Sequence, residues 1–321
     1  MTIAIGLDLG GTKIAAGVVS PDGRVVASAV RPTPAGKEAS AVLEALEEAA
    51  RQVAGEAGVG PDERVAVGLA CPGPLDPATG VVCNAPNLGW RDVPVRELLA
   101  ARLPWPCVVL NDADAAALGE ATFGAGRGAA LMLYLTISTG IGGGIVWRGR
   151  PLSGAHGVAG EFGHQVIDPD GPPCRCGRRG CLEALASGTA MARRAAERLQ
   201  QGEPSALRKL AHGDPAKVTA VLVGEAAALG DDLASDVVAE TARYLGIGVA
   251  NLVAAFDPDR VVIGGGLANL GERLLDPVRQ TVRREVLPPA GERVEIVRAT
   301  LGGFSGVVGA AWTAREAVSR P

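Results

Sequence analysis

Short apolar segments separated by glycine and proline make up the first third of the chain, and their pattern predicts alternating strands and helices. Runs of branched apolar residues bounded by Gly, Pro and Asp are typical of strands, whereas apolar residues at helical spacing predict helices. Strands are predicted at 3–9, 13–20, 25–30, 64–70 and 106–112. Helices are predicted at 40–58, 93–103 and 113–124. The first three strands, joined by tight turns, predict an antiparallel meander.

A second unit opens near residue 129 with the same pattern. The first unit reads strand, Asp-x-Gly-Gly-Thr, strand, and the second reads strand, Ser-Thr-Gly-x-Gly-Gly-Gly, strand. Such an internal repeat predicts duplicated domains. From about residue 183 the chain is Ala-rich and predicted to be mostly helical. The remaining predictions are a strand, a triple glycine and a helix over 257–282, a strand at 293–300 and a helix at 306–318.

The final helix is expected to pack back onto the N-terminal unit. This gives an N-terminal α/β lobe of residues 1–118 plus about 306–321, and a C-terminal α/β lobe of residues 119–305. No connecting segment is low in complexity, so we expect a cleft between two packed lobes rather than a flexible tether.

Composition and charge narrow the class of protein. Hydrophobic residues make up 47% of the chain but aromatic residues only 3%, so Val, Leu, Ile and Ala must build the core. The net charge of −4 and the absence of a basic patch argue against a nucleic acid partner. The N-terminus lacks the charged and apolar regions of a signal peptide, and no apolar run approaches the ~20 residues that span a bilayer. We therefore expect a cytoplasmic protein with no membrane partner, in which thiols stay reduced.

Three glycine-rich turns follow predicted strands. They are GLDLGGTKI around Asp8, TISTGIGGG at 136–144 and VVIGGGLA at 261–268. Glycine lets the backbone approach a phosphate, successive N–H groups in such turns bind anions, and a carboxylate at a strand end can hold Mg²⁺. Each turn alone can also be a plain turn. Together, without a P-loop or a G-x-G-x-x-G motif, they predict a different nucleotide-binding fold.

Asn111 and Asp112 stand where an apolar strand meets a helix, the position at which ligands gather in α/β folds. Asn offers a donor and an acceptor, and Asp can accept a proton. The alternative is that Asp112 is a helix N-cap. Asp114 is an equally good cap, which leaves Asp112 available for chemistry.

Three of the six cysteines lie within the stretch CRCGRRGCLE, at 174–183. With His164 upstream, Cys174, Cys176 and Cys181 make a Cys3His set, which is a recognised structural zinc site. Four protein ligands leave no open position for water, so such a site is structural rather than hydrolytic. Unpaired thiols or a disulfide are the alternatives, and Cys71, Cys83 and Cys107 have no assigned role.

Together these motifs resemble the ROK family of sugar kinases and sugar-responsive repressors, almost from end to end. LDLGGTKIAAGVV and TISTGIGGG resemble its two phosphate motifs, and APNLGW and NDADAAALGE its sugar-binding stretches. GEFGH followed by CRCGRRGCLEALASG resembles its zinc signature, the most specific element. Many members have Asn where this chain has Asp114. The resemblance implies the duplicated actin-like ATPase (ribonuclease H-like) fold, with two lobes, a central cleft and a small structural zinc loop at 164–181.

The resemblance also implies roles for individual residues. Asp112 would be the catalytic base. The sugar would be bound by Gly73, Asn87, Asn111, Asp112, Glu161, His164 and Glu183. Zinc would be bound by His164, Cys174, Cys176 and Cys181. MgATP would be bound by Asp8, Gly10, Gly11, Thr12, Lys13, Thr139, Gly140, Gly264, Gly265 and Gly266.

These roles predict an ATP:hexose 6-phosphotransferase that acts on glucose. An ordinary carboxylate with a pKa near 4 cannot deprotonate an alcohol in advance. In a loose phosphoryl-transfer transition state the attacking oxygen becomes acidic late, so the carboxylate of Asp112 can orient the hydroxyl first and accept its proton then. The alternatives within the class are kinases for N-acetylmannosamine, N-acetylglucosamine, fructose or allose, and polyphosphate as another phosphoryl donor.

Two other classes are less well supported. A sugar-sensing repressor of this family carries an N-terminal winged helix-turn-helix, and the motif that begins at Asp8 leaves no room for one. A non-catalytic sugar-binding scaffold would need Asp112 or the phosphate turns to be lost, and they are intact. The family also suggests a homodimer or homotetramer, with the Ala-rich helices of 184–250 as an interface or simply as core.

Overall fold

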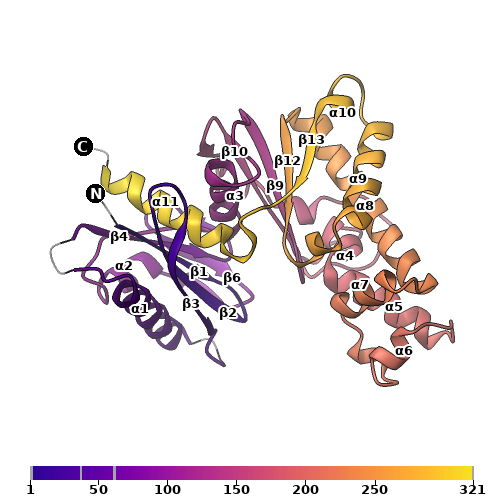
Figure 1. Ribbon diagram of the computed structural model, residues 1–321, viewed down its shortest axis with the longest axis horizontal. Coiled ribbons are helices and arrows are strands. Elements are labelled where there is room, and N and C mark those ends of the chain that lie inside the picture. The colour runs from indigo at the N-terminus through magenta and orange to yellow at the C-terminus, as the bar shows by residue number, and fades with distance from the viewer. Residues whose placement is uncertain (1–2, 37, 61–62, 320–321) are drawn as a thin grey trace. The chain divides into compact units, whose positions relative to one another are not determined.

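The computed structural model in Figure 1 describes residues 3–36, 38–60 and 63–319. Its strands are β1 (Ile3–Leu9), β2 (Lys13–Val19), β3 (Val25–Pro32), β4 (Val65–Cys71), β5 (Leu75–Asp76), β6 (Val81–Ala85), β7 (Trp90–Val93), β8 (Cys107–Asn111), β9 (Leu131–Ile137), β10 (Ile141–Trp147), β11 (Arg150–Pro151), β12 (Arg260–Gly264) and β13 (Glu295–Arg298).

The helices include several single turns as well as long elements. They are α1 (Ala39–Glu56), α2 (Val95–Ala100), α3 (Asp112–Phe123), α4 (Leu182–Ala186), α5 (Gly188–Gln200), α6 (Leu207–Leu210), α7 (Ala220–Ala228), α8 (Asp232–Phe256), α9 (Glu272–Glu285), α10 (Ala290–Arg293) and α11 (Ser305–Ser319).

Two five-stranded sheets repeat one topology. The first has the order β3-β2-β1-β4-β8 and the second β11-β10-β9-β12-β13. In the first sheet β2 is antiparallel to β1 and β3, and β4 is parallel to β1 and β8. In the second sheet β10 is antiparallel to β11, and β12 is parallel to β9 and β13. The duplicated fold predicted from the repeated strand–turn–strand pattern is therefore confirmed.

The chain divides into two compact units. Unit 1 is Met1–Ala130, Gly144–Gly160 and Thr300–Pro321, and unit 2 is Leu131–Gly143 and Glu161–Ala299. The division expected from the sequence, after residues 118 and 305, lies elsewhere. Residue 118 falls inside helix α3, and a helix that packs as one body keeps its whole length within one unit.

The alternation of side chains along β1 gives the first sheet two different faces. Ile5, Leu7 and Leu9 belong to the large core cluster under α1, whereas Ala4 belongs to a separate cluster with α11. Side chains of a strand alternate between faces, so Asp8 lies on the α11 side. The sequence thus places one carboxylate beneath the last helix.

Helix α11 approaches this second face closely because the residues opposite it are very small. A Cβ atom at Gly68 would lie 1.9 Å from the carbonyl oxygen of Ala310, and one at Gly309 would lie 1.8 Å from that of Ala115. Any larger residue would push α11 away from β4 and α3. The prediction that the final helix packs on the N-terminal unit is confirmed by these contacts.

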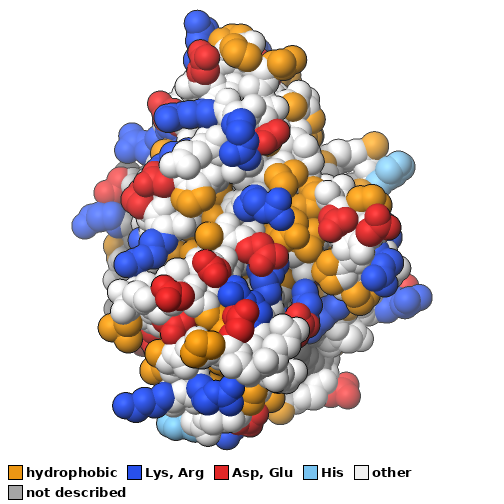
Figure 2. All heavy atoms as spheres, turned by 90° about the vertical axis from the view of Figure 1, so that its right-hand side faces the viewer, with side chains coloured by type: hydrophobic (Ala, Val, Ile, Leu, Met, Phe, Trp, Pro, Cys, Tyr) orange, Lys and Arg blue, Asp and Glu red, His pale blue; other side chains and the backbone are white. Residues whose placement is uncertain are grey.

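Helix α8 is the core helix of unit 2. By length and composition it could cross a membrane, with a mean hydropathy of 1.2 over its best window, but 61% of that window is buried within the structure. Its neighbours in unit 2 include α9, α7, α4 and α5. The face of the molecule in Figure 2 carries interspersed basic and acidic side chains with apolar ones between them. Arg198 of α5 forms an ion pair with Asp236 of α8.

The small sheet β5-β6-β7 was not predicted from the sequence. The stretch 71–80 reads as a Pro/Gly-rich loop, and its strand β5 has only two residues. The exposed Cys83 and Asn84 also interrupt the apolar pattern of β6. Strands this short and this exposed do not show the alternation on which strand prediction depends.

Candidate active site and metal centre

Asn111 and Asp112 stand at the junction of β8 and α3, as predicted, but the helix cap is a different residue. Asn111 is the N-cap, and its Oδ1 accepts hydrogen bonds from the N–H groups of Ala113 (2.9 Å) and Asp114 (3.2 Å). The alternative that Asp112 caps the helix is therefore excluded, and Asp114 is not the cap either. Asp112 is the first helical residue and is half-buried, with Oδ1 accepting from the N–H of Ala113 at 2.9 Å.

Asn111 also holds Gly73 in place. Its Nδ2 donates to the carbonyl oxygen of Gly73 at 3.2 Å. Gly73 has φ +91° and a Cβ there would lie 2.1 Å from the carbonyl oxygen of Asn84, so only glycine fits. Of the predicted sugar-binding residues, Gly73, Asn111 and Asp112 are thus brought together. Asn87 lies in the exposed turn between β6 and β7.

The carboxylate of Asp8 lies at the carboxyl end of β1, against the first turn of α11. A Cβ on Gly306 would lie 2.6 Å from Oδ2 of Asp8, so glycine is required there. Burial, and secondarily the charge of Asp112, raise the pKa of Asp8 to about 7, although Lys13 acts in the opposite direction. Two acidic groups close enough to repel each other are suited to hold a divalent metal.

The first glycine turn closes directly after Asp8. The N–H of Gly10 donates to the carbonyl oxygen of Lys13 at 2.8 Å, and Thr33 Oγ1 donates to the carbonyl oxygen of Gly10 at 2.7 Å. Gly11 is half-buried, whereas Thr12 and Lys13 are exposed. The predicted phosphate set of unit 1 therefore forms one continuous, tightly closed turn.

The second glycine turn joins β9 to β10 in unit 2 and contains Thr139 and Gly140. It closes with a hydrogen bond from the N–H of Ser138 to the carbonyl oxygen of Gly140 at 2.9 Å. The triple glycine lies beside it, because a Cβ at Gly265 would lie 2.4 Å from the carbonyl oxygen of Ile137. Two glycine-rich segments that are far apart in the sequence thus meet at one edge of the sheet.

Glu183 stands beside this second turn. Its Oε2 accepts a hydrogen bond from the N–H of Ile141 at 2.9 Å, and a Cβ at Gly140 would lie 2.4 Å from the same oxygen. The sequence associates Glu183 with the sugar and Gly140 with the nucleotide. The structure brings these two residues into direct contact.

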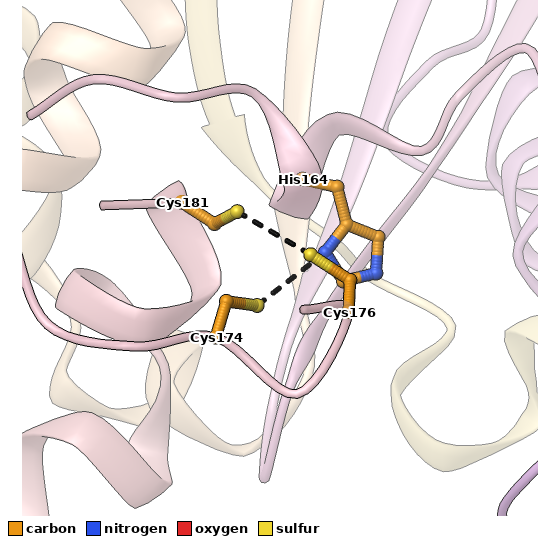
Figure 3. Close-up of side chains that lie close together, drawn as sticks. All are labelled: His164, Cys174, Cys176 and Cys181. Carbon is orange, nitrogen blue, oxygen red and sulfur yellow. Dashed lines mark hydrogen bonds between the residues drawn. The ribbon is translucent and has the colours of Figure 1, made fainter. Parts of the chain in front are cut away.

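His164, Cys174, Cys176 and Cys181 converge in unit 2, as Figure 3 shows, with their ligand atoms all within 4.8 Å of one another. Sγ of Cys176 lies 3.6 Å from Sγ of Cys181, and Sγ of Cys174 lies 3.7 Å from Nδ1 of His164. A disulfide is excluded at the first distance, because its S–S bond is about 2.05 Å. A zinc tetrahedron with Zn–S bonds of about 2.3 Å has S–S edges of about 3.8 Å, which these distances match.

The loop around this cluster is closed by its own backbone. The N–H of Cys174 donates to the carbonyl oxygen of Arg178 at 2.8 Å, and the N–H of Gly180 donates to that of Pro172 at 2.9 Å. Gly180 has φ +64°, and a Cβ there would overlap the carbonyl oxygen of Asp168 at 1.4 Å. The tight turn that holds the sulfurs together therefore depends on this glycine.

The two nitrogens of His164 face different groups. Nδ1 faces the cysteine sulfurs, while Nε2 lies 3.9 Å from Oε2 of Glu161. At 3.9 Å the two groups are neighbours without a direct hydrogen bond. Within unit 2 the predicted residues Glu161 and His164 are thus brought together next to the cluster.

The cysteines of the cluster differ in the direction of their pKa shifts. Hydrogen bonding from the backbone N–H of Arg178 lowers the pKa of Cys176 to about 6, whereas burial raises that of Cys181 to about 12. The thiolate is the form that ligates metal. Outside this cluster, burial raises the pKa of Cys107 to about 11, and Cys71 is fully buried with its pKa raised further still.

Glu120 is a structurally important residue that the sequence analysis missed. It is fully buried on α3, and its carboxylate accepts hydrogen bonds from the N–H groups of Ala125 (2.9 Å), Thr300 (3.1 Å) and Leu301 (2.8 Å) and from Ser305 Oγ (2.9 Å). It therefore ties α3 to the start of α11 within unit 1. The signal was a charged residue among the small and apolar residues in the second half of α3, since Glu is almost never fully buried without partners.

Known proteins with similar sequences share this architecture. The model of the ROK family matches residues 4–317. Glucokinase from Streptomyces coelicolor is 41% identical over 98% of both chains. The crystal structure of a ROK family glucokinase from Streptomyces griseus, in complex with glucose and AMPPNP, has a TM-score of 0.87 at 39% identity and covers 98% of this chain and 99% of its own. A ROK hexokinase structure from Thermus thermophilus has a TM-score of 0.80 at 42% identity over 99% of both chains.

The two sheets repeat one topology, each has a glycine turn, and the carboxylate of Asp112 directly follows β8. This is the actin-like ATPase fold that these enzymes share. The chain belongs to the ROK family.

Proposed function

We propose that the chain is an ATP-dependent hexose kinase that transfers the γ-phosphoryl group of ATP to the 6-hydroxyl of glucose. The observation that carries the proposal is the match along nearly the whole chain to the Streptomyces griseus glucokinase that was crystallised with glucose and AMPPNP. The residues agree with this chemistry, because two glycine turns suit phosphates and a half-buried carboxylate suits a general base.

Asp112 is proposed to act as the base. The Asn111 cap fixes the backbone at Asp112, so the Asp112 carboxylate projects from the first turn of a rigid helix. In a loose transition state it orients the attacking hydroxyl and accepts the proton as the phosphoryl group arrives. Gly73 and Asn111 lie beside Asp112. Further sugar hydroxyls are proposed to pair with Asn87, Glu161, His164 and Glu183. Buried polar partners of this kind reject sugars that lack the matching hydroxyl.

Asp8 is proposed to hold Mg²⁺ through water, and each of the two glycine turns is proposed to bind nucleotide phosphates. The turns consist of Gly10, Gly11, Thr12 and Lys13 in unit 1 and of Thr139 and Gly140, with Gly264, Gly265 and Gly266, in unit 2. Divalent cations neutralise charge that develops on the transferred phosphoryl group.

The Cys3His cluster is proposed to hold a structural Zn²⁺. The distances within the cluster and the thiolate character of Cys176 fit that ion. Bound zinc supplies cross-linking rather than chemistry, because all four positions are taken by His164, Cys174, Cys176 and Cys181. The closed loop holds His164 so that its Nε2 faces Glu161.

The sequence leaves the preferred sugar open, and a panel of hexoses decides it. Purified protein is assayed with MgATP and glucose, mannose, fructose, allose, N-acetylmannosamine or N-acetylglucosamine, with ADP release coupled to NADH oxidation. Glucose is expected to give the highest kcat/KM. A higher kcat/KM for an N-acetylhexosamine would replace glucose as substrate, and no sugar-dependent ADP release would overturn the proposal. Polyphosphate in place of ATP tests the donor.

Assembly and location complete the proposal. We propose a cytoplasmic homodimer or homotetramer that uses no nucleic acid or membrane partner. The helical surface of unit 2 carries strongly exposed apolar side chains, Leu229 and Leu287 among them, which suit a contact between copies. Light scattering after size exclusion gives the mass directly, and a monomeric mass would contradict this part of the proposal.

A further inference from the structure

The second glycine turn is held from outside by the junction between α4 and α5. The N–H of Gly188 donates to the carbonyl oxygen of Ser138 at 2.7 Å, and Thr189 Oγ1 donates to that of Thr139 at 2.7 Å. On the third peptide, the N–H of Ile141 donates to Glu183 at 2.9 Å. Three consecutive peptide groups of the turn are thus bound by a single short segment, residues 183–189.

These bonds fix where the N–H groups of the turn point. In a planar trans peptide the C=O and N–H bonds point in opposite directions. The carbonyl of Ser138 and the N–H of Thr139 share one such plane, and the carbonyl of Thr139 and the N–H of Gly140 share the next. Because both carbonyls face the α4–α5 junction, both N–H groups face away from it. Parallel N–H groups of this kind make an anion-binding concavity.

The junction has little freedom to move. A Cβ at Gly188 would lie 2.7 Å from the carbonyl oxygen of Ser138, so the contact is already as close as glycine allows. Ser187 caps α5 through its Oγ, which accepts from the N–H of Ala190 at 3.2 Å. Arg194 of α5 donates to the carbonyl oxygen of Leu185 at 2.7 Å and so fastens α4 to α5.

The same segment begins at the Cys3His cluster. Cys181 is the N-cap of α4, and the N–H of the next residue, Leu182, donates to the carbonyl oxygen of Gln165 at 2.9 Å. Only the five-residue helix α4 separates Cys181 from the junction. A displacement of Cys181 therefore reaches the turn through one rigid helical turn.

We propose that Thr189 is a positioning residue for the nucleotide phosphates, and that the α4–α5 junction makes nucleotide affinity depend on an intact Cys3His cluster. The inference rests on the proposed function, because it takes the turn at Thr139 and Gly140 as a phosphate site. It goes beyond it by assigning the cluster a role in nucleotide binding as well as in sugar binding.

The first test replaces the Thr189 hydroxyl and measures binding rather than turnover. Thr189 is exposed, so Thr189→Val removes one donor with little effect on the core. Titration calorimetry with Mg·AMPPNP is expected to show Kd raised about five- to tenfold, as the loss of one hydrogen bond implies. The Kd for glucose and the Tm are expected to stay at the wild-type values, and Thr189→Ser, which keeps the hydroxyl, is expected to restore nucleotide binding.

A matched control separates positioning from stability. Thr219 caps α7 in the same unit with its Oγ1, which accepts from the N–H of Leu222, and it is equally exposed. Thr219→Val is expected to lower Tm and leave the Kd for AMPPNP unchanged. Equal AMPPNP affinity in wild type and Thr189→Val would overturn the inference alone. A wild-type protein that binds no AMPPNP would overturn the proposed function and the inference with it.

The second test concerns the cluster. Metal is removed by a chelator at a temperature at which circular dichroism shows that the protein stays folded. The Kd for AMPPNP is expected to rise about tenfold in the wild type, and by less in Thr189→Val, because one link to the turn is already lost. Metal removal that weakens glucose binding and leaves AMPPNP binding unchanged would overturn the link between cluster and turn.

Discussion

The two five-stranded sheets have the same order but carry different chemistry at matching positions. Asp8 of β1 pairs with Ala70 of the parallel neighbour β4, and Thr136 of β9 pairs with Gly264 of the parallel neighbour β12. Each residue stands two positions before the glycine turn of its sheet. The first sheet thus places a partly buried carboxylate where the second places a hydroxyl, so one backbone frame supports two different sites.

The sheets also differ in what is inserted between equivalent strands. Between β3 and β4 the first sheet has α1, which covers its core face. Between β11 and β12 the second has the Cys3His loop and α4 to α8. Under the proposed function, the first sheet would supply the base, the Mg²⁺ site and one phosphate turn, and the second would supply a phosphate turn whose backbone other elements fix.

The largest effect is expected at Asp112, which follows β8 in the first sheet. Asp112→Asn removes the proton acceptor but keeps the size of the side chain, so kcat should fall by about three orders of magnitude. The Kd for glucose, measured by calorimetry, should stay nearly unchanged. Asp114→Asn is the matched control, because the amide oxygen can still accept from Ser153 Oγ as the carboxylate does at 2.8 Å. Normal turnover of Asp112→Asn would refute the base assignment.

The equivalent positions of the two sheets provide the next comparison. Asp8→Asn should lower kcat/KM for MgATP by about 100-fold and raise the Mg²⁺ concentration needed for half-maximal rate, because a metal-binding charge is lost. Thr136→Val changes the matching residue of the second sheet and should alter the same parameters less than about threefold. Equal losses at both positions would show that the sheets do not divide the chemistry as described.

Loss of the Cys3His cluster should change the KM for glucose by a smaller factor than loss of Asp112 or Asp8 changes kcat or kcat/KM. Cys176→Ala removes one of four ligands, so the KM for glucose should rise by about tenfold, with a lower Tm or loss of the fold. Zinc content is measured by mass spectrometry on the same samples. Cys83→Ala, an exposed cysteine outside the cluster, should change none of these values. A fully active, zinc-free protein would contradict the structural role given to the Cys3His cluster.

Features of the fold and the site that a local sequence pattern decides could be predicted from the sequence. The glycine turns, the Cys3His set and the strand–helix junction at Asp112 are continuous motifs, and the predicted fold was confirmed. The small sheet β5-β6-β7 was missed because its strands have two, five and four residues. Short strands, together with the Pro/Gly-rich stretch 71–80 and the exposed residues of β6, limited that prediction.

Contacts between distant segments could not be predicted. The bond from Thr189 to Thr139 joins residues 50 positions apart, and the one from Thr300 to Glu120 joins residues 180 apart. Neither leaves a periodic signal, because each depends on how complete elements pack. The N-cap could not be assigned for a related reason. Asn111, Asp112 and Asp114 are all good caps by residue type, and only the backbone angles and hydrogen bonds of Asn111 decide between them.

The smallest effect concerns the partly buried carboxyl of Asp8. Its pKa is about 7 in the folded protein against an ordinary 3.8, so the folded state holds a proton that the unfolded chain has released. This contribution to stability is complete below pH 3.8 and is lost as pH rises through 7. In Mg²⁺-free buffer, Asp8→Asn should therefore gain Tm relative to the wild type between pH 5 and pH 8, by roughly 5 °C. A Tm difference that is constant with pH would contradict the assignment.

The central claim is that the chain moves a phosphoryl group from ATP to the 6-hydroxyl of glucose. Phosphorus NMR of a reaction with MgATP and glucose labelled with ¹³C at carbon 6 tests it most directly. We predict ADP and a phosphate monoester whose phosphorus couples to the labelled carbon. A product without that coupling, or ADP formed equally without glucose, would contradict the claim.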